Sequence, residues 1–450
     1  MAAVTERKQA AHVYFAMTRG LCGLCHAAID VKILFRDDAV WFEKFCPDHG
    51  NQRVLVSSSI EWYLDCLSFL APSVPPKRAP KPVERGCPFD CGACVSHQQR
   101  LSLPLVPLHV REPAGGDHAH ARGARALSRD ELADILRHLV ADGSDLDELV
   151  FTSGEHPELP EFLQMCREAG IGRPVVATDG VGLHDEVYLA RLAALDARVT
   201  LRLDDRAPDT DALLDLLGEH GVSTTLRPTR TPADASMGRL LEGLIGRAHL
   251  RSLELETPAG QPADRRTSGR ITVPDLQATI ERATAGRIGP KDFVPSPLAH
   301  VHCYSICPVL CLDDGDFVPF TRFMTRAGLF ALLQDSTYIE PRAKLQAALR
   351  TAIDTLRGEA APLAANETVL RTLECLEREV YPTEDTTRLP ARRLSDRQRL
   401  IERRVKFIII HAHMDADDFD VSRIMKCSVG LPGPDGSSLP LCVHNVLGET

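Results

Sequence analysis

The chain has 450 residues and a formal net charge of −10, and it contains no long basic run. The length allows two or three domains with a sizeable core, and the charge argues against nucleic-acid binding through phosphates. No apolar run approaches the roughly 20 residues that a membrane span needs. The first residues, MAAVTERKQAAHVYF, also lack the apolar core of a secretory signal. We therefore expect a cytoplasmic protein without a membrane span.

Residues 1–75 are expected to form an N-terminal metal-binding domain. Fourteen cysteines stand in the chain, and in a reducing compartment short-spaced cysteines more often bind metal than form disulfides. The first group pairs C-x2-C with C-x2-H, a spacing typical of a tetrahedral site for zinc or a single iron. Its candidate ligands are Cys22, Cys25, Cys46 and His49. His26 competes with His49, a hairpin is expected around Asp37 and Asp38, and core cysteines beside a turn histidine are the alternative.

Residues 76–100 are expected to hold a proline-rich linker and a loop with three cysteines. The segment APSVPPKRAPKPVERG favours an extended spacer. The following GCPFDCGAC places Cys87, Cys91 and Cys94 in the pattern C-x3-C-x2-C. Three thiolates at this spacing can bind three irons of a [4Fe–4S] cluster and leave the fourth open to S-adenosylmethionine. Zinc is the alternative metal.

From 101 to about 260, strand-like apolar runs alternate with helical patterns. PLVPLHV precedes LSRDELADILRHLVADG, and RPVVATDG precedes DEVYLARLAAL; three similar units and a closing strand complete the series. Ser128 and Glu131 fit a capping box at the start of the first helix. About six strand–helix units predict a parallel sheet, open or curled, and are too few for an eight-unit barrel. An ordinary doubly wound α/β domain is the alternative.

The remaining chain combines charged helices with a cysteine-bearing tail. We interpret the Arg-rich RRLSDRQRLIERR as a solvated helix face and the FIII run at 407–410 as a buried strand. The tail then reads as a helix and a hairpin, whose GPDG turn brings Cys427 and Cys442 near each other.

A third cysteine group, HCYSICPVLC, precedes the helices. Because iron–sulfur cubes usually take four thiolates, we expect an auxiliary cluster on Cys303, Cys307, Cys427 and Cys442. Cys311 sits in a strand-like run and is expected to pack as a small apolar residue. The isolated cysteines are expected to be core residues as well; they are Cys66, Cys166 and Cys375.

Several segments together resemble radical S-adenosylmethionine enzymes similar to archaeal tetraether lipid synthase and its bacterial relatives. They include LCGLC…KFCPDHG, RGCPFDCGACVSHQQ, FTSGEHPELPEF, VVATDGV, ITVPDLQATIE, KDFVPSPLAHVHCYS, DDGDFVPFTRFM and FIIIHAHMDADDFDVSRIMKC…LPLCVHNV. The resemblance implies an α/β fold with a partial (β/α)6 barrel at 101–325 and a C-terminal cysteine-bearing α+β region at 326–450. It also implies iron–sulfur clusters, S-adenosylmethionine and radical C–H chemistry on a lipid.

The resemblance also implies cofactor-binding residues. Ser153, Gly154 and Glu155 resemble the family's Gly-Gly-Glu, which holds the amino group of the cofactor, with Ser153 in place of a glycine. Asp179, in TDG, resembles a strand-end Thr-Asn-Gly. Ordinary turn and helix-cap chemistry is the alternative for both segments.

One departure from the family concerns the radical cluster itself. Family members carry a further C-x3-C-x2-C at the end of the first barrel strand, whereas GCPFDCGAC resembles an auxiliary site. Here that position holds REPAGGDHAHARGAR, and no cysteine occurs from Val95 to Met165. A substitute metal site on Asp117, His118 and His120 is one hypothesis for this loop, and a solvated loop is the other.

Three functional hypotheses follow. The first is a degenerate family member that keeps the fold and the metal sites, lacks radical cleavage and serves as a partner or binding protein beside an active enzyme. The second is an active enzyme for C–C bond formation or C–H modification, with its cluster on Cys87, Cys91 and Cys94. The third is a structural zinc or iron protein without cofactor chemistry.

Overall fold

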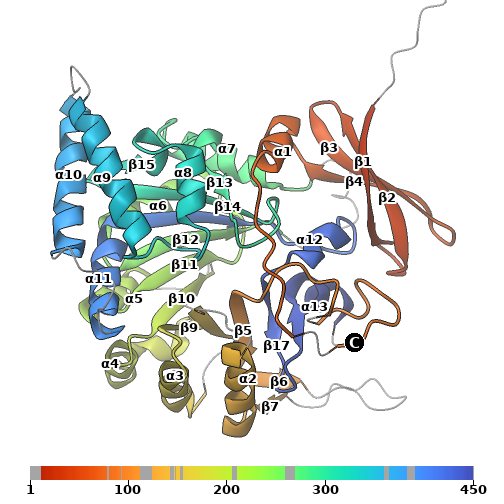
Figure 1. The fold of residues 1–450 in the computed structure, drawn as a ribbon, viewed down its shortest axis with the longest axis horizontal. Helices are drawn as coiled ribbons and strands as arrows, with labels where there is room; N and C mark the ends of the chain where they lie inside the picture. The colour runs from red at the N-terminus through yellow and green to blue at the C-terminus, as the bar shows by residue number, and fades with distance from the viewer. Residues whose placement is uncertain are drawn as a thin grey trace, which may run out of the picture.

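The computed structural model describes residues 12–78, 81–92, 94–111, 124–141, 146, 148–152, 156–204, 210–258, 269–358, 364–382 and 391–448. The N-terminal part is an antiparallel four-stranded sheet, drawn in red at the right of Figure 1. Asp37 and Asp38 form its central turn with φ values of 51° and 58°, which confirms the expected hairpin. The strands and the helix that follows are β1 (Val13–Leu21), β2 (Ala28–Arg36), β3 (Ala39–Cys46), β4 (Gly50–Ser57) and α1 (Ile60–Leu67).

The main sheet begins with six parallel strands that lie side by side in chain order. They are β5 (Leu103–Pro107), β8 (Glu148–Thr152), β9 (Arg173–Thr178), β10 (Arg198–Leu203), β11 (Thr224–Pro228) and β12 (Leu250–Glu256). The connecting helices are α2 (Arg129–Ala141), α3 (Leu159–Glu168), α4 (Glu186–Ala194), α5 (Thr210–Glu219) and α6 (Asp234–Gly246), and a short pair, β6 (His109–Arg111) and β7 (Ala124–Ala126), follows β5. The expected alternation and the mixed α/β class are confirmed. The Ser128 backbone N–H donates to Glu131 at 3.1 Å and the Glu131 N–H to Ser128 Oγ at 3.3 Å, as the capping box requires.

The C-terminal region contributes strands to this same sheet. β16 (Val405–His411) runs parallel to β12, and β17 (Val429–Pro432) pairs in parallel with β5. β14 (Tyr304–Cys311) is antiparallel to β16, β18 (Ser438–Pro440) forms a hairpin with β17, and β13 (Val294–Pro295) and β15 (Phe317–Pro319) flank β14. The sheet therefore crosses the boundary that the sequence placed between residues 325 and 326. The tail has the expected order of strand, helix and hairpin.

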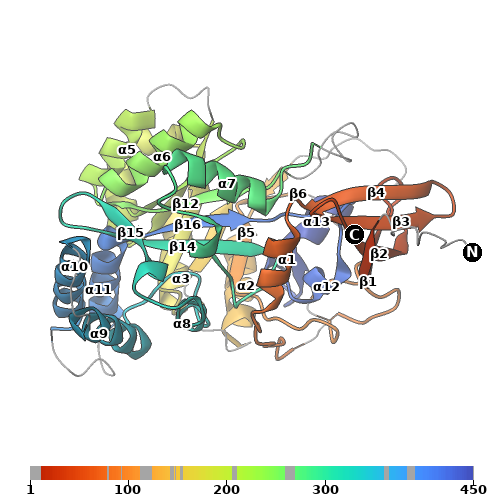
Figure 2. The same ribbon diagram turned by 90° about the horizontal axis from the view of Figure 1, so that it is seen from above.

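Helices cover both faces of the sheet around β16. Ile408 and Ile410 pack in one core with α7 (Val273–Ala283), whereas Phe407 and Ile409 pack in another with α8 (Arg326–Leu332) and α9 (Ala343–Gly358). This alternation explains the continuous apolar run, because a strand covered on both faces needs no polar side. Figure 2 shows α5, α6 and α7 along one side of these strands and α8 and α9 along the other. The remaining helices are α10 (Ala364–Val380), α11 (Ala391–Arg404), α12 (Val421–Met425) and α13 (Leu441–Leu447), and the 3-10 turns are η1 (Val181–His184), η3 (Pro290–Asp292) and η4 (Phe320–Arg322).

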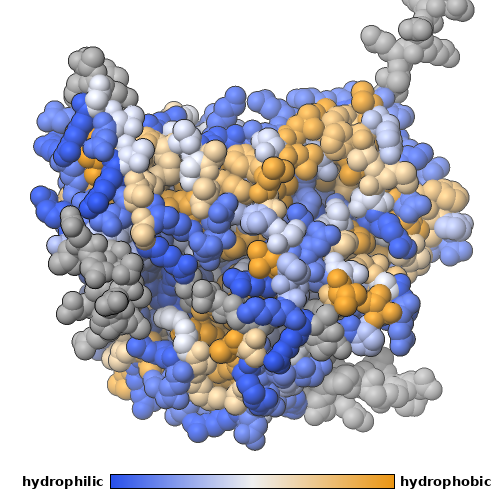
Figure 3. Space-filling model, viewed as in Figure 1, coloured by the Kyte–Doolittle hydropathy of each residue, from blue (hydrophilic) through white to orange (hydrophobic). Residues whose placement is uncertain are grey.

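The surface differs between the two ends of the molecule. Figure 3 shows apolar side chains gathered over α1 and the neighbouring N-terminal strands, where Val13, Tyr14 and Met17 are exposed, and polar side chains over α9 and α10. Among the described residues, every helix is too short or too polar to cross a membrane.

Candidate metal centres

The first centre lies where two turns of the N-terminal sheet face each other. Cys22 directly follows β1 and Cys46 ends β3, and each begins a turn that carries the second ligand of its pair, Cys25 or His49. The four ligand atoms all lie within 4.8 Å of one another. Cys25 Sγ is 3.8 Å from Cys46 Sγ, and His49 Nδ1 is 3.6 Å from Cys22 Sγ and 3.5 Å from Cys46 Sγ. The structure brings all four expected ligands together.

These distances fit a tetrahedral metal ion. Zn–S bonds of about 2.3 Å and Zn–N bonds of about 2.0–2.1 Å place tetrahedral ligands about 3.8 Å apart for two sulfurs and about 3.6 Å apart for sulfur and nitrogen. His26 is outside this group and adopts a left-handed φ of 58° in the turn. Burial opposes ionisation of Cys22, but hydrogen bonds from the Cys25 and Leu24 backbone and from Gln52 lower its pKa to about 6. Cys22 is thereby favoured in the thiolate form that binds a metal ion.

The turn that carries Cys22 and Cys25 is packed directly on the C-terminal region. Buried Lys44 donates from Nζ to the carbonyl oxygens of Leu21 and of Asp417, the latter at 2.7 Å. Gly23, between the first two cysteines, approaches so closely that a Cβ there would lie 1.8 Å from Asp417 Oδ1. A side chain at this position would displace the Asp417 carboxylate. Figures 1 and 2 both show α12 and α13 between the N-terminal sheet and the main sheet.

The second centre is the loop with three cysteines. The Asp90 carboxylate shapes this loop by accepting backbone N–H groups of Glu84 and Gly86, at 2.8 and 2.7 Å, and also that of Arg85. Cys91 and Cys94 are buried, and Cys87 is half-buried. Side-chain contacts with Cys91 and, after the opposing effect of burial, with Cys94 lower the pKa of Cys87 to about 7. Three converging thiols of this kind can hold an iron–sulfur cluster.

This loop docks on the cysteine-bearing tail. The Gln98 N–H donates to the Met425 carbonyl at 2.6 Å, and His97 Nε2 lies 2.8 Å from the Cys427 carbonyl oxygen. Contact with Cys87 and burial raise the pKa of Cys91, and negative charge at Cys427 raises it further. The second centre is therefore a direct neighbour of the third.

The third centre gathers Cys303, Cys427 and Cys442. The β17–β18 hairpin sets Gly430 opposite Pro440, so Cys427 and Cys442 both lie at its open end. Burial, and then charge at Cys442 and Cys303, raises the pKa of Cys427. This is the proximity that the GPDG turn predicts.

Cys307 does not join these three thiols. It is fully buried in the core of the main sheet, and the charges that act on it come from Asp292 and Arg322. Four residues along a strand separate it from Cys303 by roughly 13 Å of chain. The expected fourth ligand of the auxiliary cluster is thus misplaced, and Cys307 packs as a core residue. Cys66 and Cys166 are also buried, whereas Cys311 and Cys375 are half-buried.

Sequence reasoning missed a polar group at the carboxyl ends of β12 and β16. Glu256 and His411 are register partners, and His413 follows two residues later, so all three reach one place. Their ligand atoms lie within 4.8 Å of one another, with His413 Nε2 at 3.3 Å from Glu256 Oε1. Arg227 lies 3.6 Å from the same Glu256 oxygen. The alternating HAH after the FIII strand was the available signal.

Burial and neighbouring charges shift the pKa values of all three side chains in this group. Burial opposes ionisation of Glu256, but the contact with His413 and the charge of Arg227 lower its pKa to about 2. Burial opposes protonation of His413 as well, yet the contacts with Cys442 and Glu256 raise its pKa to about 9. Burial and the charge of His413 hold the pKa of His411 well below its usual range. His413 therefore links the strand-end carboxylate to the third centre.

The expected cofactor residues are only partly described. Ser153, Gly154 and Glu155 lie outside the described residues, as do Asp117, His118 and His120. Asp179 is exposed, and its carboxylate accepts the Val181 N–H at 3.3 Å. This is the local turn geometry of the alternative reading.

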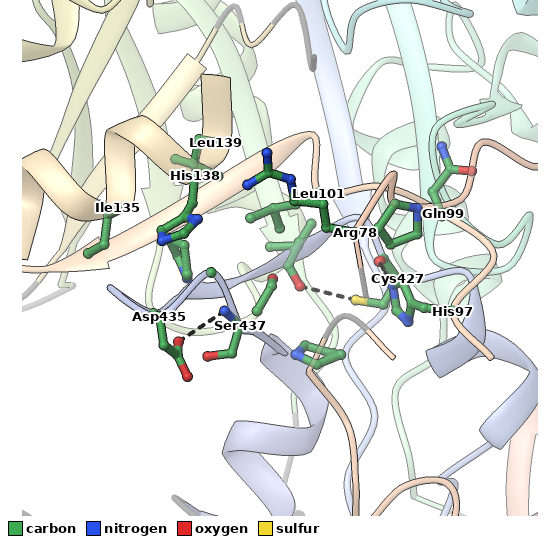
Figure 4. A pocket seen from close by; sticks show the side chains of 17 residues that line it. Arg78, His97, Gln99, Leu101, Ile135, His138, Leu139, Cys427, Asp435 and Ser437 are labelled. Atoms are coloured by element: carbon green, nitrogen blue, oxygen red, sulfur yellow. Dashed lines mark hydrogen bonds between the residues drawn. The ribbon is translucent and has the colours of Figure 1, made fainter. Parts of the chain in front are cut away.

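A pocket of about 180 Å³ opens beside the third centre. In Figure 4, Cys427 and His97 lie at one end, and Ile135, His138 and Leu139 of α2 lie at the other. Asp435 and Ser437 of the β17–β18 turn form part of the wall. The pocket thus joins apolar walls to a few polar groups next to a candidate metal ligand.

Known proteins resemble this chain in two ways. Residues 14–58 match the family described as the HMPTM N-terminal zinc ribbon domain. Over 96% of its length, the chain is 24% identical to 7,8-dihydro-6-hydroxymethylpterin dimethyltransferase of Methanocaldococcus jannaschii, covering 93% of that protein.

Solved structures give weaker matches. Streptococcus suis SuiB bound to S-adenosylmethionine is 14% identical with a TM-score of 0.33, over 41% of this chain and 47% of SuiB. HydG, a maturase of the [FeFe]-hydrogenase, is 14% identical with a TM-score of 0.29, over 42% of this chain and 51% of HydG. The match spans about half the length of each of these structures.

Proposed function

We propose that this chain is an iron–sulfur protein of the radical S-adenosylmethionine superfamily that binds a reduced pterin and does not itself cleave S-adenosylmethionine. In this proposal the N-terminal ribbon holds zinc and the main sheet is a partial (β/α)6 barrel. The protein then serves as a partner or binding protein beside an active enzyme. The similarity to a pterin dimethyltransferase across nearly the whole chain supports the pterin.

The position of the three-cysteine loop supports the proposed absence of S-adenosylmethionine cleavage. The loop with Cys87, Cys91 and Cys94 is anchored to Met425 and Cys427 of the tail, beside another cysteine group. No cysteine occurs from Val95 to Met165, where a cluster motif after β5 would stand. Two adjacent cysteine groups suit clusters that exchange electrons, whereas radical initiation needs an open iron facing the substrate.

The pocket in Figure 4 supports a small heterocycle as the ligand. Its volume of about 180 Å³ has room for a bicyclic ring, and Leu101 and Leu139 offer apolar walls for the ring faces. Polar groups such as Asp435 can pair with ring nitrogens. A lipid, which the resemblance to tetraether lipid synthase implies, needs a longer apolar channel and is the alternative substrate.

The decisive experiment measures S-adenosylmethionine cleavage directly. The full chain is reconstituted anaerobically with iron and sulfide, analysed for iron, sulfide and zinc, and incubated with S-adenosylmethionine and dithionite. We expect bound clusters and zinc but no 5′-deoxyadenosine above the protein-free background. Production of 5′-deoxyadenosine by the loaded protein would show that the proposal of a non-cleaving protein is wrong.

Pterin binding is tested by fluorescence titration with 7,8-dihydro-6-hydroxymethylpterin. Ser437→Trp places a large side chain in the pocket wall and is expected to weaken binding at least tenfold. Val187→Trp, at an exposed position on α4, is the matched control and should bind like the parent protein. Equal binding by both variants would place the pterin elsewhere, and no binding by the parent protein would exclude this ligand.

The half-buried, acidified thiol of Cys87 favours a second candidate function. In that case the loop cluster itself binds and cleaves S-adenosylmethionine. Cleavage that is lost in Cys87→Ala but kept in Cys307→Ala would establish this function. Both substitutions remove one cysteine, so the difference separates cluster loss from a general loss of folding.

A further inference from the structure

His413 presents one nitrogen that is paired and one that is not. Nε2 lies 3.3 Å from Glu256 Oε1, while the buried Nδ1 has no hydrogen-bond partner among the described residues. The side chain of His413 is 9% exposed, so water does not readily satisfy this atom. An unpaired buried polar atom costs about 1–3 kcal/mol, and its retention calls for a reason.

The surroundings of Nδ1 supply that reason. The Ala412 N–H donates to the Cys303 carbonyl at 2.8 Å, which fixes Cys303 beside the start of the His413 segment. Cys442 contacts His413, and Cys427 and Cys442 meet at the open end of the β17–β18 hairpin. Three thiols from three segments therefore lie close to the segment that carries His413.

We propose that His413 Nδ1 is the fourth ligand of an iron–sulfur cluster held by Cys303, Cys427 and Cys442. This inference rests on the proposed function as an iron–sulfur protein and adds a ligand of a different kind. Three thiolates leave one iron of a cube without a protein ligand, and imidazole is an established replacement for thiolate in such clusters. Cys307, buried in the core, cannot fill this place.

Glu256 completes the arrangement. Metal-binding histidines usually donate their other ring N–H to a carboxylate, which fixes the ring and its tautomer. The Glu256 carboxylate accepts the N–H of His413 Nε2, so the lone pair falls on Nδ1 once a metal displaces the proton there. Arg423, whose guanidinium donates to the Ala412 carbonyl at 2.6 Å, adds positive charge beside thiolates that would otherwise be buried together.

The ligand set differs from the close-packed sets that suit a single ion. Among the described residues, the groups whose ligand atoms all lie within 4.8 Å are the zinc-ribbon set and Glu256 with His411 and His413. The three thiols and Nδ1 are not all within that distance of one another. Each ligand of a cube binds a different iron, so wider spacing is what a cluster requires.

Pulsed electron paramagnetic resonance tests the proposal. The full chain is produced with 15N-labelled histidine, reconstituted anaerobically and reduced with dithionite. We expect a directly coordinated 15N coupling in the parent protein and its loss in His413→Cys, with iron and sulfide unchanged. Because a thiolate adds negative charge to the cluster, the midpoint potential should fall in this variant.

Two histidine variants serve as matched controls. His97→Asn removes the ring beside the Cys427 carbonyl, and His411→Asn removes the ring whose centroid lies 3.9 Å from that of His413. Both should keep the coupling. If His413→Cys does not hold the cluster, the two control variants test the proposal instead. Coupling that is kept in both variants supports His413 as the ligand. Loss of coupling in either variant assigns the nitrogen to another histidine and overturns the proposal.

The remaining outcomes separate this inference from the proposed function. Clusters without 15N coupling in the parent protein, or coupling that persists in His413→Cys, overturn the ligand and leave the iron–sulfur function standing. A reconstituted protein that holds no iron or sulfide overturns both.

Discussion

The N-terminal metal centre, here called the ribbon after the family that residues 14–58 match, and the third cysteine centre are built in opposite ways. The ribbon takes its four ligands from two short turns of one small sheet, and its Cys25 and His49 are exposed. The third centre takes Cys303, Cys427 and Cys442 from segments that meet only through the main sheet and its final hairpin. The ribbon is therefore a local structure, whereas the third centre exists only once most of the chain has folded.

This difference determines which part of the protein is stabilised by the metal of each centre. A local site forms from nearby hairpins at little loop-closure cost, so its metal stabilises mainly its own small sheet. A site assembled from distant segments links those segments when it is loaded. Loss of its metal should then lower the stability of the whole main sheet.

The largest expected effect comes from comparing two cysteines on the same segment. Cys303→Ala should remove the iron and sulfide of the third centre, whereas Cys307→Ala should keep them and cost about 1 kcal/mol through lost core packing. Iron and sulfide analysis after reconstitution, with urea unfolding of both variants, measures this. Equal iron loss in the two variants would mean that the core placement of Cys307 is wrong.

A second comparison concerns the ribbon. Cys46→Ala should lower bound zinc from about one per chain to near zero, because three remaining ligands leave the tetrahedral set incomplete. Cys66→Ala, a buried cysteine of α1 outside the set, should keep the zinc. Elemental analysis of the purified variants decides, and zinc retained in Cys46→Ala contradicts the four-ligand geometry. Iron in the third centre should be the same in both variants, because the two centres share no ligand.

The smallest effect tests how the two regions are joined. Lys44→Met removes the charged donor to the Leu21 and Asp417 carbonyls and should lower the free energy of unfolding by about 2–3 kcal/mol. Lys32→Met, at an exposed position on β2, should change it by less than about 0.5 kcal/mol. Urea unfolding of the zinc-loaded variants provides the comparison. Equal stability would show that the buried lysine does not hold the ribbon to the tail.

Local sequence patterns predicted the parts of this protein that local physics decides. The paired spacing of the ribbon cysteines, the capping box at Ser128 and the hairpin at Asp37 each depend on a few neighbouring residues. The alternation of strands and helices predicted the parallel sheet for the same reason. The GPDG turn was enough to bring Cys427 and Cys442 together.

Features that depend on the register between distant strands could not be predicted from local sequence patterns. Cys303 and Cys307 look equivalent in HCYSICPVLC, and only the pairing of β14 with β16 sends one toward the tail and the other into the core. The alternating HAH was the one signal for His413 and did not reveal its partners, because they lie far away in the chain. The single sheet that joins strands from both sides of residue 325 could not be foreseen, because a strand carries no mark of its sheet partners.

The pairing of β17 with β5 has a consequence for synthesis on the ribosome. The edge of β5 receives its partner only when residues 429–432 have emerged, long after the six parallel strands. Until then the nascent chain carries an open strand edge, which is a template for aggregation. A chain terminated before residue 429 keeps all six ordered parallel strands but leaves that edge bare. Such fragments should collect in inclusion bodies even though most of the core is present.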